Sequence, residues 1–223
     1  MNTKGFFSDD STKTIQVKGF SRILVAPDQI EVSITIRESH EQYVVVRENE
    51  KKRAEAIRAT LALNEIDPQQ LKSKSFSIEP DYETQYDGHG NTTSKFIGFV
   101  CWHTMSLYLD MDMGFLGKVV EAICSCEAEP ELNILFKIKE PGVHSKDLLE
   151  QAVLDAKNRA RILAKAAGVD LHSVLHIEYT GETSHTPIRM LGETHVGAYN
   201  SFMNEPKHIE LNEEVLMIWA IGD

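Results

Sequence analysis

Strict alternation of apolar and polar residues marks the clearest strand in the chain. From Ile30 to Ile36 every second residue is a branched aliphatic residue, and the residues between them are polar. Because successive side chains of a strand point to opposite faces, this pattern predicts a strand with one buried face. The same alternation predicts an earlier strand over 14–19, which we expect to end at Gly19.

Apolar residues at helical spacing predict a helix after the second strand. Ser39 and Gln42 form the pattern of a capping box, so we expect the helix to begin there. Its inward face is expected to carry Tyr43, Val46, Ala54, Ile57 and Leu61. A second helix is predicted over 114–126, and we expect Asp112 to cap its first turn.

A third helix is predicted to begin at about Ser145, and one of its faces carries only small side chains. These are Ala152, Ala156, Ala160, Ala164 and Ala167. Side chains of this size let a helix lie close to a sheet or to another helix. Gly168 suits the position that ends the helix, because glycine adopts the left-handed conformation readily.

The remaining pattern completes an α+β fold. Further strands are predicted over 72–78, 96–109, 132–138, 174–179 and 209–221. The polar stretch 80–94 is predicted to be a mobile hairpin loop, and 180–207 is predicted to be a long loop whose composition favours mobility. The order of elements indicates a mostly antiparallel sheet with helices packed on one face. We expect a flexible N-terminal arm over 1–13 and one domain over 14–223.

A similar succession occurs twice along the chain. The first helix leads through the segment 66–71 into a strand, a long loop and a return strand. The third helix leads through the segment 169–174 into the same elements. This similarity indicates a duplicated helix–strand–loop–strand unit. The residue identity between the two segments is slight, so coincidence remains the alternative.

Composition excludes some classes of partner. The chain has 223 residues, of which 42% are hydrophobic, so it can bury a sizeable core. Its formal net charge of -11 disfavours binding to nucleic acid and to anionic membranes, because both interactions depend on Lys and Arg. No stretch of the sequence is long and apolar enough to predict an integral membrane segment.

The N-terminus and the cysteines bear on the compartment. Residues 1–10 lack the apolar segment of a secretory signal. The three cysteines are an odd number, which suits a reducing compartment better than a disulfide framework. We therefore expect a cytoplasmic protein if the chain is complete, and a periplasmic one if a signal peptide has been removed.

Four groups of residues contain side chains that occur in chemical sites, and none predicts catalysis, a metal or a cofactor. Cys124 and Cys126 are expected to be ordinary buried thiols, because zinc sites space their cysteines more widely and need further ligands. Cys101 and His103 share one face of a strand, where a packed cysteine beside a hydrogen-bonded histidine is favoured over half of a metal site.

The other two groups are also interpreted as structural. The acidic segment 110–114 lacks the residues that a calcium loop needs at its fifth and sixth positions. His172 and His176 lie at the start of a strand and are expected to be surface or capping residues. The sequence contains no nucleophile elbow, no phosphate-binding loop and no dinucleotide fingerprint.

Several features in order resemble the SIMPL-domain family. The segment 14–19, then Pro27-Asp28, then the alternating strand resembles the opening of these proteins, and Pro206 before a last apolar strand resembles their end. The alanine-bearing third helix followed by Gly168 is also similar, so the resemblance covers about 14–221.

The resemblance implies a limited set of properties. Family members are α+β proteins, often bacterial and exported to the periplasm or outer membrane. One relative forms a large channel-like homo-oligomer, others are linked to oxidative-stress tolerance, and a mammalian relative is an adaptor in kinase signalling. The resemblance supplies no catalytic residue, and this sequence departs from the family pattern because it shows no export signal.

We therefore expect a non-enzymatic interaction protein, which forms a homo-oligomer through exposed strand edges or the long loops and has a possible protein partner. The alternative is a small-molecule-binding protein, with a pocket between the sheet and the long loops that Tyr82, Tyr86 and Tyr199 could line. An enzyme is the third alternative, which would need a cleft with convergent titratable groups.

Overall fold

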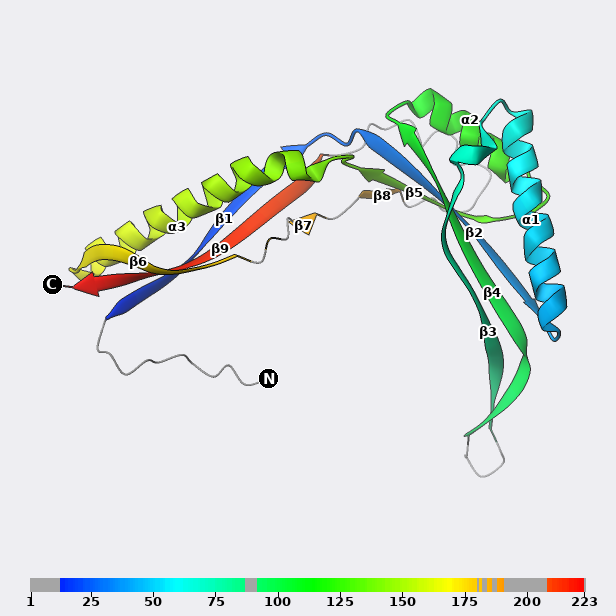
Figure 1. Ribbon diagram of the computed structural model, residues 1–223, viewed down its shortest axis with the longest axis horizontal. Helices are drawn as coiled ribbons and strands as arrows, with labels where there is room; N and C mark the ends of the chain where they lie inside the picture. The colour runs from blue at the N-terminus through cyan, green and yellow to red at the C-terminus, as the bar shows by residue number, and fades with distance from the viewer. Residues whose placement is uncertain are drawn as a thin grey trace. The chain divides into compact units, whose positions relative to one another are not determined.

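The computed structural model describes residues 13–86, 92–179, 181, 184–185, 188–190 and 208–222. These residues group into two compact units, which are built from interleaved segments of the chain. Unit 1 consists of the described residues within Met1–Val25, Glu140–Thr186 and His208–Asp223, and unit 2 consists of the described residues within Ala26–Lys139 and Pro187–Lys207. The predicted α+β class is confirmed, because each unit is an antiparallel sheet with helix packed on one face (Figure 1). The domain predicted over 14–223 comprises both units.

The described part of unit 1 is a sheet covered by one α-helix. In spatial order its strands are β1 (Thr14–Val25), β9 (Ile209–Gly222) and β6 (Asp170–Glu178), and the short β7 (Ser184–His185) also pairs with β9. The helix α3 (Ser145–Ala167) follows a short 3₁₀ helix, η2 (Pro141–His144). Residues on one face of the sheet, among them Val17 and Met217, form the core together with the alanines of α3.

Gly19 sets the distance between α3 and β1. The predicted strand end at Gly19 is wrong, because β1 continues to Val25. A Cβ atom at Gly19 would lie 2.0 Å from the carbonyl oxygen of Ala152 and 2.6 Å from Cβ of Ala156. Glycine is therefore required here for the close approach of helix and strand.

The small residues of α3 face the sheet as predicted. Ala152, Ala156, Ala160 and Ala164 are buried, whereas Ala167 in the last turn is exposed. Gly168 follows the helix with φ of 72°, so the predicted left-handed end is confirmed.

Unit 2 is a wider sheet with two α-helices on one face in the described residues. In spatial order its strands are β3 (Lys72–Tyr86), β4 (Thr92–Asp110), β2 (Gln29–His40), β5 (Glu131–Lys137) and β8 (Ile188–Met190). The helices are α1 (Tyr43–Leu63) and α2 (Met113–Cys124), and a short 3₁₀ helix, η1 (Pro68–Gln70), follows α1. The four aliphatic residues predicted for the buried face of β2 are fully buried in this core: Ile30, Val32, Ile34 and Ile36.

The two helix starts in unit 2 differ in how well the sequence predicts them. Asp112 caps α2 as predicted, since its Oδ1 accepts a 2.9 Å hydrogen bond from Phe115 N–H. The capping box at the start of α1 is wrong, because β2 continues to His40 and α1 has no side-chain cap. Tyr43 is 46% exposed rather than inward-facing, and its ring packs edge-on against Phe99.

The predicted loop 80–94 is largely a hairpin. β3 runs to Tyr86, which pairs with Thr92 at the start of β4. Pro80 fits within β3 because this is an edge strand, where the N–H group that proline lacks is not needed by a neighbour. The predicted loop 180–207 contains β7 and β8, and most of its other residues lie outside the described chain, as do residues 1–12 of the predicted arm.

Both units contain the succession that the sequence indicated. In unit 2, α1 is followed by the antiparallel pair β3 and β4, and in unit 1, α3 is followed by the antiparallel pair β6 and β9. The spatial orders β3-β4-β2 and β6-β9-β1 also correspond. The two units therefore share the topology of three strands and one helix, to which unit 2 adds α2, β5 and β8.

Candidate functional sites

Cys101 and His103 lie on the helix-facing side of β4, as the pattern of the strand predicts. Both are buried, and His103 is hydrogen-bonded as expected. Burial and, to a smaller extent, the nearby carboxylates of Glu50 and Glu38 together raise the pKa of the Cys101 thiol to about 11. The thiol is therefore held in its protonated form, which is a poor nucleophile and a poor metal ligand.

His103 connects a buried carboxylate to an exposed hydroxyl. Its Nδ1 lies 2.5 Å from Glu50 Oε1 on α1, and its Nε2 lies 2.8 Å from Ser73 Oγ on β3. Glu50 and His103 are buried, whereas Ser73 is exposed. We call these three residues the His103 cluster. Residues 50, 73 and 103 lie far apart in sequence, and no local sequence motif predicts that their side chains are in contact.

A second polar cluster lies on the sheet face opposite the helices. The Glu31 carboxylate is 0% exposed and is ion-paired with Lys137 and, at 2.7 Å, with Lys74. Ser106 Oγ donates a 2.7 Å hydrogen bond to the same carboxylate. Burial alone raises the pKa of Glu31, but the bonds from Lys137, Lys74 and Ser106 outweigh it and lower the pKa to about 2. The Glu31 cluster is therefore a fixed ionic link between four residues of the sheet.

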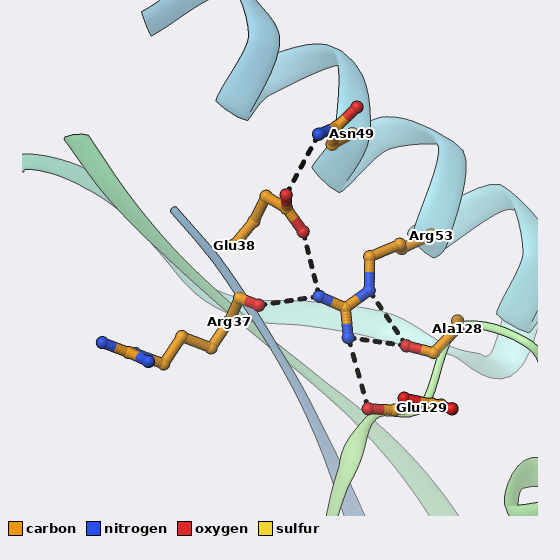
Figure 2. Close-up of polar contacts among 6 residues, drawn as sticks. All are labelled: Arg37, Glu38, Asn49, Arg53, Ala128 and Glu129. Carbon is orange, nitrogen blue, oxygen red and sulfur yellow. Dashed lines mark hydrogen bonds and ion pairs between the residues drawn. The ribbon is translucent and has the colours of Figure 1, made fainter. Parts of the chain in front are cut away.

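A third polar group, the Arg53 network, ties α1 to its surroundings (Figure 2). The Arg53 guanidinium donates to the carbonyl oxygens of Ala128, Glu129 and Arg37 at 2.6 to 3.2 Å. It also donates to the Glu38 carboxylate at 3.1 Å, whose other oxygen accepts from Asn49. Because every contact holds one piece of the fold against another, we interpret this network as structural.

The other residues singled out in the sequence do not converge. Cys126 is buried as predicted, but Cys124 is exposed at the last residue of α2, so its expected burial is wrong. His172 and His176 are both exposed on β6, in agreement with surface residues. In the described chain no group of three or more His, Cys, Asp or Glu residues is arranged to hold a metal ion.

The tyrosines expected to line a pocket are only partly described. Tyr82 is exposed, and its ring packs edge-on against Phe96 in the β3–β4 hairpin. The side chain of Tyr86 and all of Tyr199 lie outside the described residues. An open groove of about 430 Å³ is found instead between β1 and α3 of unit 1, lined in part by Phe20 and Leu163.

Unit 1 carries exposed apolar residues on β6. The helix α3 packs mainly on β1 and β9, and of the β6 side chains only Leu171 packs against the core while residues 172–178 are exposed. The β6 apolar surface consists of Val174, Leu175 and Ile177 in the strand and Tyr179 directly after it. β6 pairs with β9 along one edge, and in the described chain no strand pairs with its other edge.

Among all the residues that the structure describes, no helix is long and apolar enough to cross a membrane.

Comparison with known proteins gives one clear result. A search of curated proteins found no match. The family model SIMPL, which describes a protein of unknown function (DUF541), matches residues 15–214. This range covers most of the chain and includes strands and helices of both units. The chain therefore belongs to the SIMPL family.

Proposed function

We propose that this protein acts as a self-associating interaction protein, and that two copies meet through β6 of unit 1. The observation that carries the proposal is the row of exposed apolar residues on a strand whose outer edge is unpaired in the described chain. An exposed apolar edge strand is a template for pairing with another chain, and proteins that remain monomeric normally protect such edges.

The opposite edge of the same sheet has such protection. Phe20 N–H on β1 donates a 2.9 Å hydrogen bond to the Asp155 carboxylate on α3. This bond, together with the contact to Arg159, lowers the pKa of Asp155, so the carboxylate that covers the β1 edge remains charged. β1 also carries Lys18, which is ion-paired with Glu214. The contrast between a protected β1 and an unprotected β6 favours β6 as the contact.

The chemistry of β6 favours a second copy of this chain as the occupant. Residues 173–177 contain no acidic side chain, whereas the whole chain has a net charge of -11. Two acidic copies repel each other least where each presents a segment without acidic side chains. A two-fold contact places the same surface on both sides, and an apolar strand edge can pair with itself in antiparallel fashion.

Sedimentation velocity over a range of protein concentrations tests this proposal. The unmodified chain is expected to form a dimer, and Ile177→Lys is expected to weaken it at least about tenfold because a buried charge costs more than about 1.4 kcal/mol. Ile162→Lys on α3 is the matched control, since Ile162 is 67% exposed and Ile177 is 54% exposed. A monomer at all concentrations, or equal weakening by both substitutions, would contradict the proposal.

A second candidate function is the binding of a small apolar ligand in the groove between β1 and α3. Phe20, Ile162 and Leu163 give the groove an apolar lining, while Arg159 is already paired with Asp155 at 2.8 Å. Neutral apolar compounds are therefore expected to bind better than anions. A thermal-shift screen should find compounds that raise the melting temperature of the unmodified chain but not of Leu163→Glu. Equal shifts in both proteins would exclude the groove as their site.

A further inference from the structure

The His103 cluster has the connectivity of a nucleophilic relay. Three elements contribute one residue each: Ser73 from β3, His103 from β4 and Glu50 from α1. Hydrogen-bond distances of 2.8 Å and 2.5 Å join hydroxyl to imidazole and imidazole to carboxylate. In many unrelated folds a hydroxyl becomes a nucleophile when it is hydrogen-bonded to a base that a third group orients.

The partners of the two ring nitrogens fit one tautomer of the neutral His103 ring. A carboxylate can only accept a hydrogen bond, so His103 Nδ1 carries the proton that is shared with Glu50. In the neutral ring Nε2 then has a free lone pair, which accepts from Ser73 Oγ–H. This tautomer is the one that can take a proton from the serine.

The burial of the three residues and a β-bulge beside Ser73 are both compatible with a reaction at the serine hydroxyl. Glu50 and His103 are buried, whereas Ser73 is an exposed residue whose bond to the ring is partly buried. The pairing of β3 with β4 shifts between Ser73 and Ser75, which leaves Lys74 out of register. Such bulges re-aim side chains and occur often beside active sites. Lys74 turns to the Glu31 cluster on the other sheet face, while Ser73 turns to His103.

The surroundings indicate the class of substrate. The ring of Phe76 is 51% exposed and packs edge-on against the His103 ring at 5.3 Å, so it offers an apolar surface beside the relay. The net charge of -11 disfavours anionic substrates. β3 is the edge strand of its sheet in the described chain, and outward-facing N–H groups of an edge strand can donate to a developing oxyanion.

We propose that Ser73 is the nucleophile of an acyl-transfer site for neutral carboxylic esters with a small apolar acyl group. Ser73 Oγ forms a bond to the carbonyl carbon while its proton passes to His103 Nε2. The bond from this carbon to the alkoxy oxygen breaks, and His103 returns the proton to the leaving alcohol. Water then attacks the acyl-serine with His103 as base, which releases the carboxylic acid and regenerates the serine hydroxyl. Glu50 acts as a positioning residue that holds the ring.

The test is covalent labelling of the full chain with a fluorophosphonate probe, followed by peptide mass spectrometry. We expect one phosphonylated residue, Ser73, and a burst of p-nitrophenolate from p-nitrophenyl acetate. His103→Gln is expected to slow both reactions about 100-fold, which is a typical contribution of a general base. Glu50→Gln is expected to slow them less, because a polar partner for Nδ1 remains.

Ser75→Ala is the matched control for Ser73→Ala. Ser75 lies two residues further along β3 and pairs with Thr104, whose hydroxyl contacts Thr35 rather than His103. Ser73→Ala must remove the label and the burst, and Ser75→Ala must retain both. Thermal melting of each variant shows that it is folded.

Two results would overturn the proposal. One is the absence of label on Ser73 in the folded, unmodified chain. The other is ester cleavage that persists in Ser73→Ala, which would assign it to another nucleophile such as the exposed Cys124. Either result would leave the His103 cluster as a hydrogen-bond network that only fixes α1 against the sheet. The self-association proposed above does not depend on the outcome.

Discussion

The two units share one topology but are covered differently. In unit 2, α1 and α2 bury large side chains such as Ile57, Leu61 and Leu116 against the sheet. In unit 1, α3 alone presents mainly alanines to the sheet. Small side chains bring a helix close to the strands beneath it but fill little space on either side. Helices on this topology can therefore either lie close to a few strands, as α3 does, or cover more of the sheet, as α1 and α2 do.

The polar groups of the two units follow from this difference. Unit 2 has polar clusters on both faces of its sheet, with Glu50 and Arg53 on α1 reaching residues of the strands and loops. In unit 1, α3 reaches β1 through Asp155, while β6 keeps an exposed apolar surface. Unit 2 thus holds the groups suited to chemistry, and unit 1 holds the surface suited to association.

The largest effect is expected where α3 meets β1. Gly19→Ala places a Cβ atom against backbone that cannot give way, which should cost about 3 kcal/mol or more of unfolding free energy. Gly117→Ala in α2 makes the same chemical change with nothing within 4 Å and should stabilise by about 0.5–1 kcal/mol. Urea unfolding followed by the fluorescence of the buried Trp219, with Trp102 replaced by Phe, measures the effect of Gly19→Ala on unit 1, and hydrogen exchange of α2 peptides measures the effect of Gly117→Ala on unit 2. A tolerated Gly19→Ala would disprove close approach as the feature that distinguishes unit 1.

The next effect concerns the ionic link in unit 2 and depends on pH. The pKa of Glu31 falls from 4.5 to about 2 on folding, so its contribution is complete above about 4.5 and is lost as the pH falls toward 2. The shift corresponds to about 3 kcal/mol at neutral pH. Glu31→Gln should therefore destabilise unit 2 at pH 7 and differ little from the unmodified chain near pH 2.

Hydrogen exchange of β2 and β4 peptides across this pH range measures the Glu31 contribution. Glu55→Gln is the control, because Glu55 is exposed and its pairing with Lys51 at 3.8 Å is screened by solvent. A Glu31→Gln deficit that stays constant from pH 7 to pH 2 would show that the carboxylate contributes through shape rather than charge.

The smallest effect is expected in the Arg53 network. Arg53→Lys keeps the charge but provides three donors in place of the guanidinium fork, which leaves carbonyl partners unsatisfied. We expect a loss of about 1–2 kcal/mol in unit 2. Arg47→Lys on the exposed side of the same helix should have no measurable effect. If both substitutions changed the free energy of unfolding in urea equally, the network would contribute little to holding α1 on the sheet of unit 2.

Much of the fold could be predicted because its signals are local. The alternation at 30–36, the alanines of α3 and the left-handed Gly168 each depend on neighbours within a few residues. The errors arise where a tertiary neighbour overrides the local signal. The strand β2 takes Ser39 into its ladder opposite Val100, which removes it from the expected capping box.

The candidate sites were less predictable for the same reason. Glu31 occupies an outward position of an amphipathic strand, and only the approach of Lys74 and Lys137 buries it. Ser73 and Glu50 carry no motif, because a hydrogen-bond relay built across β3, β4 and α1 has no fixed spacing in the sequence.

The sequence by itself determined the order of the main strands and helices, most of their apolar faces, and the family to which the chain belongs. Tertiary structure alone decided that β6 keeps its apolar residues exposed and that a serine, a histidine and a glutamate meet at one edge of unit 2. The physical reason is range. Periodicity and turn chemistry act over a few residues, whereas coverage and side-chain convergence depend on elements brought together from distant parts of the chain.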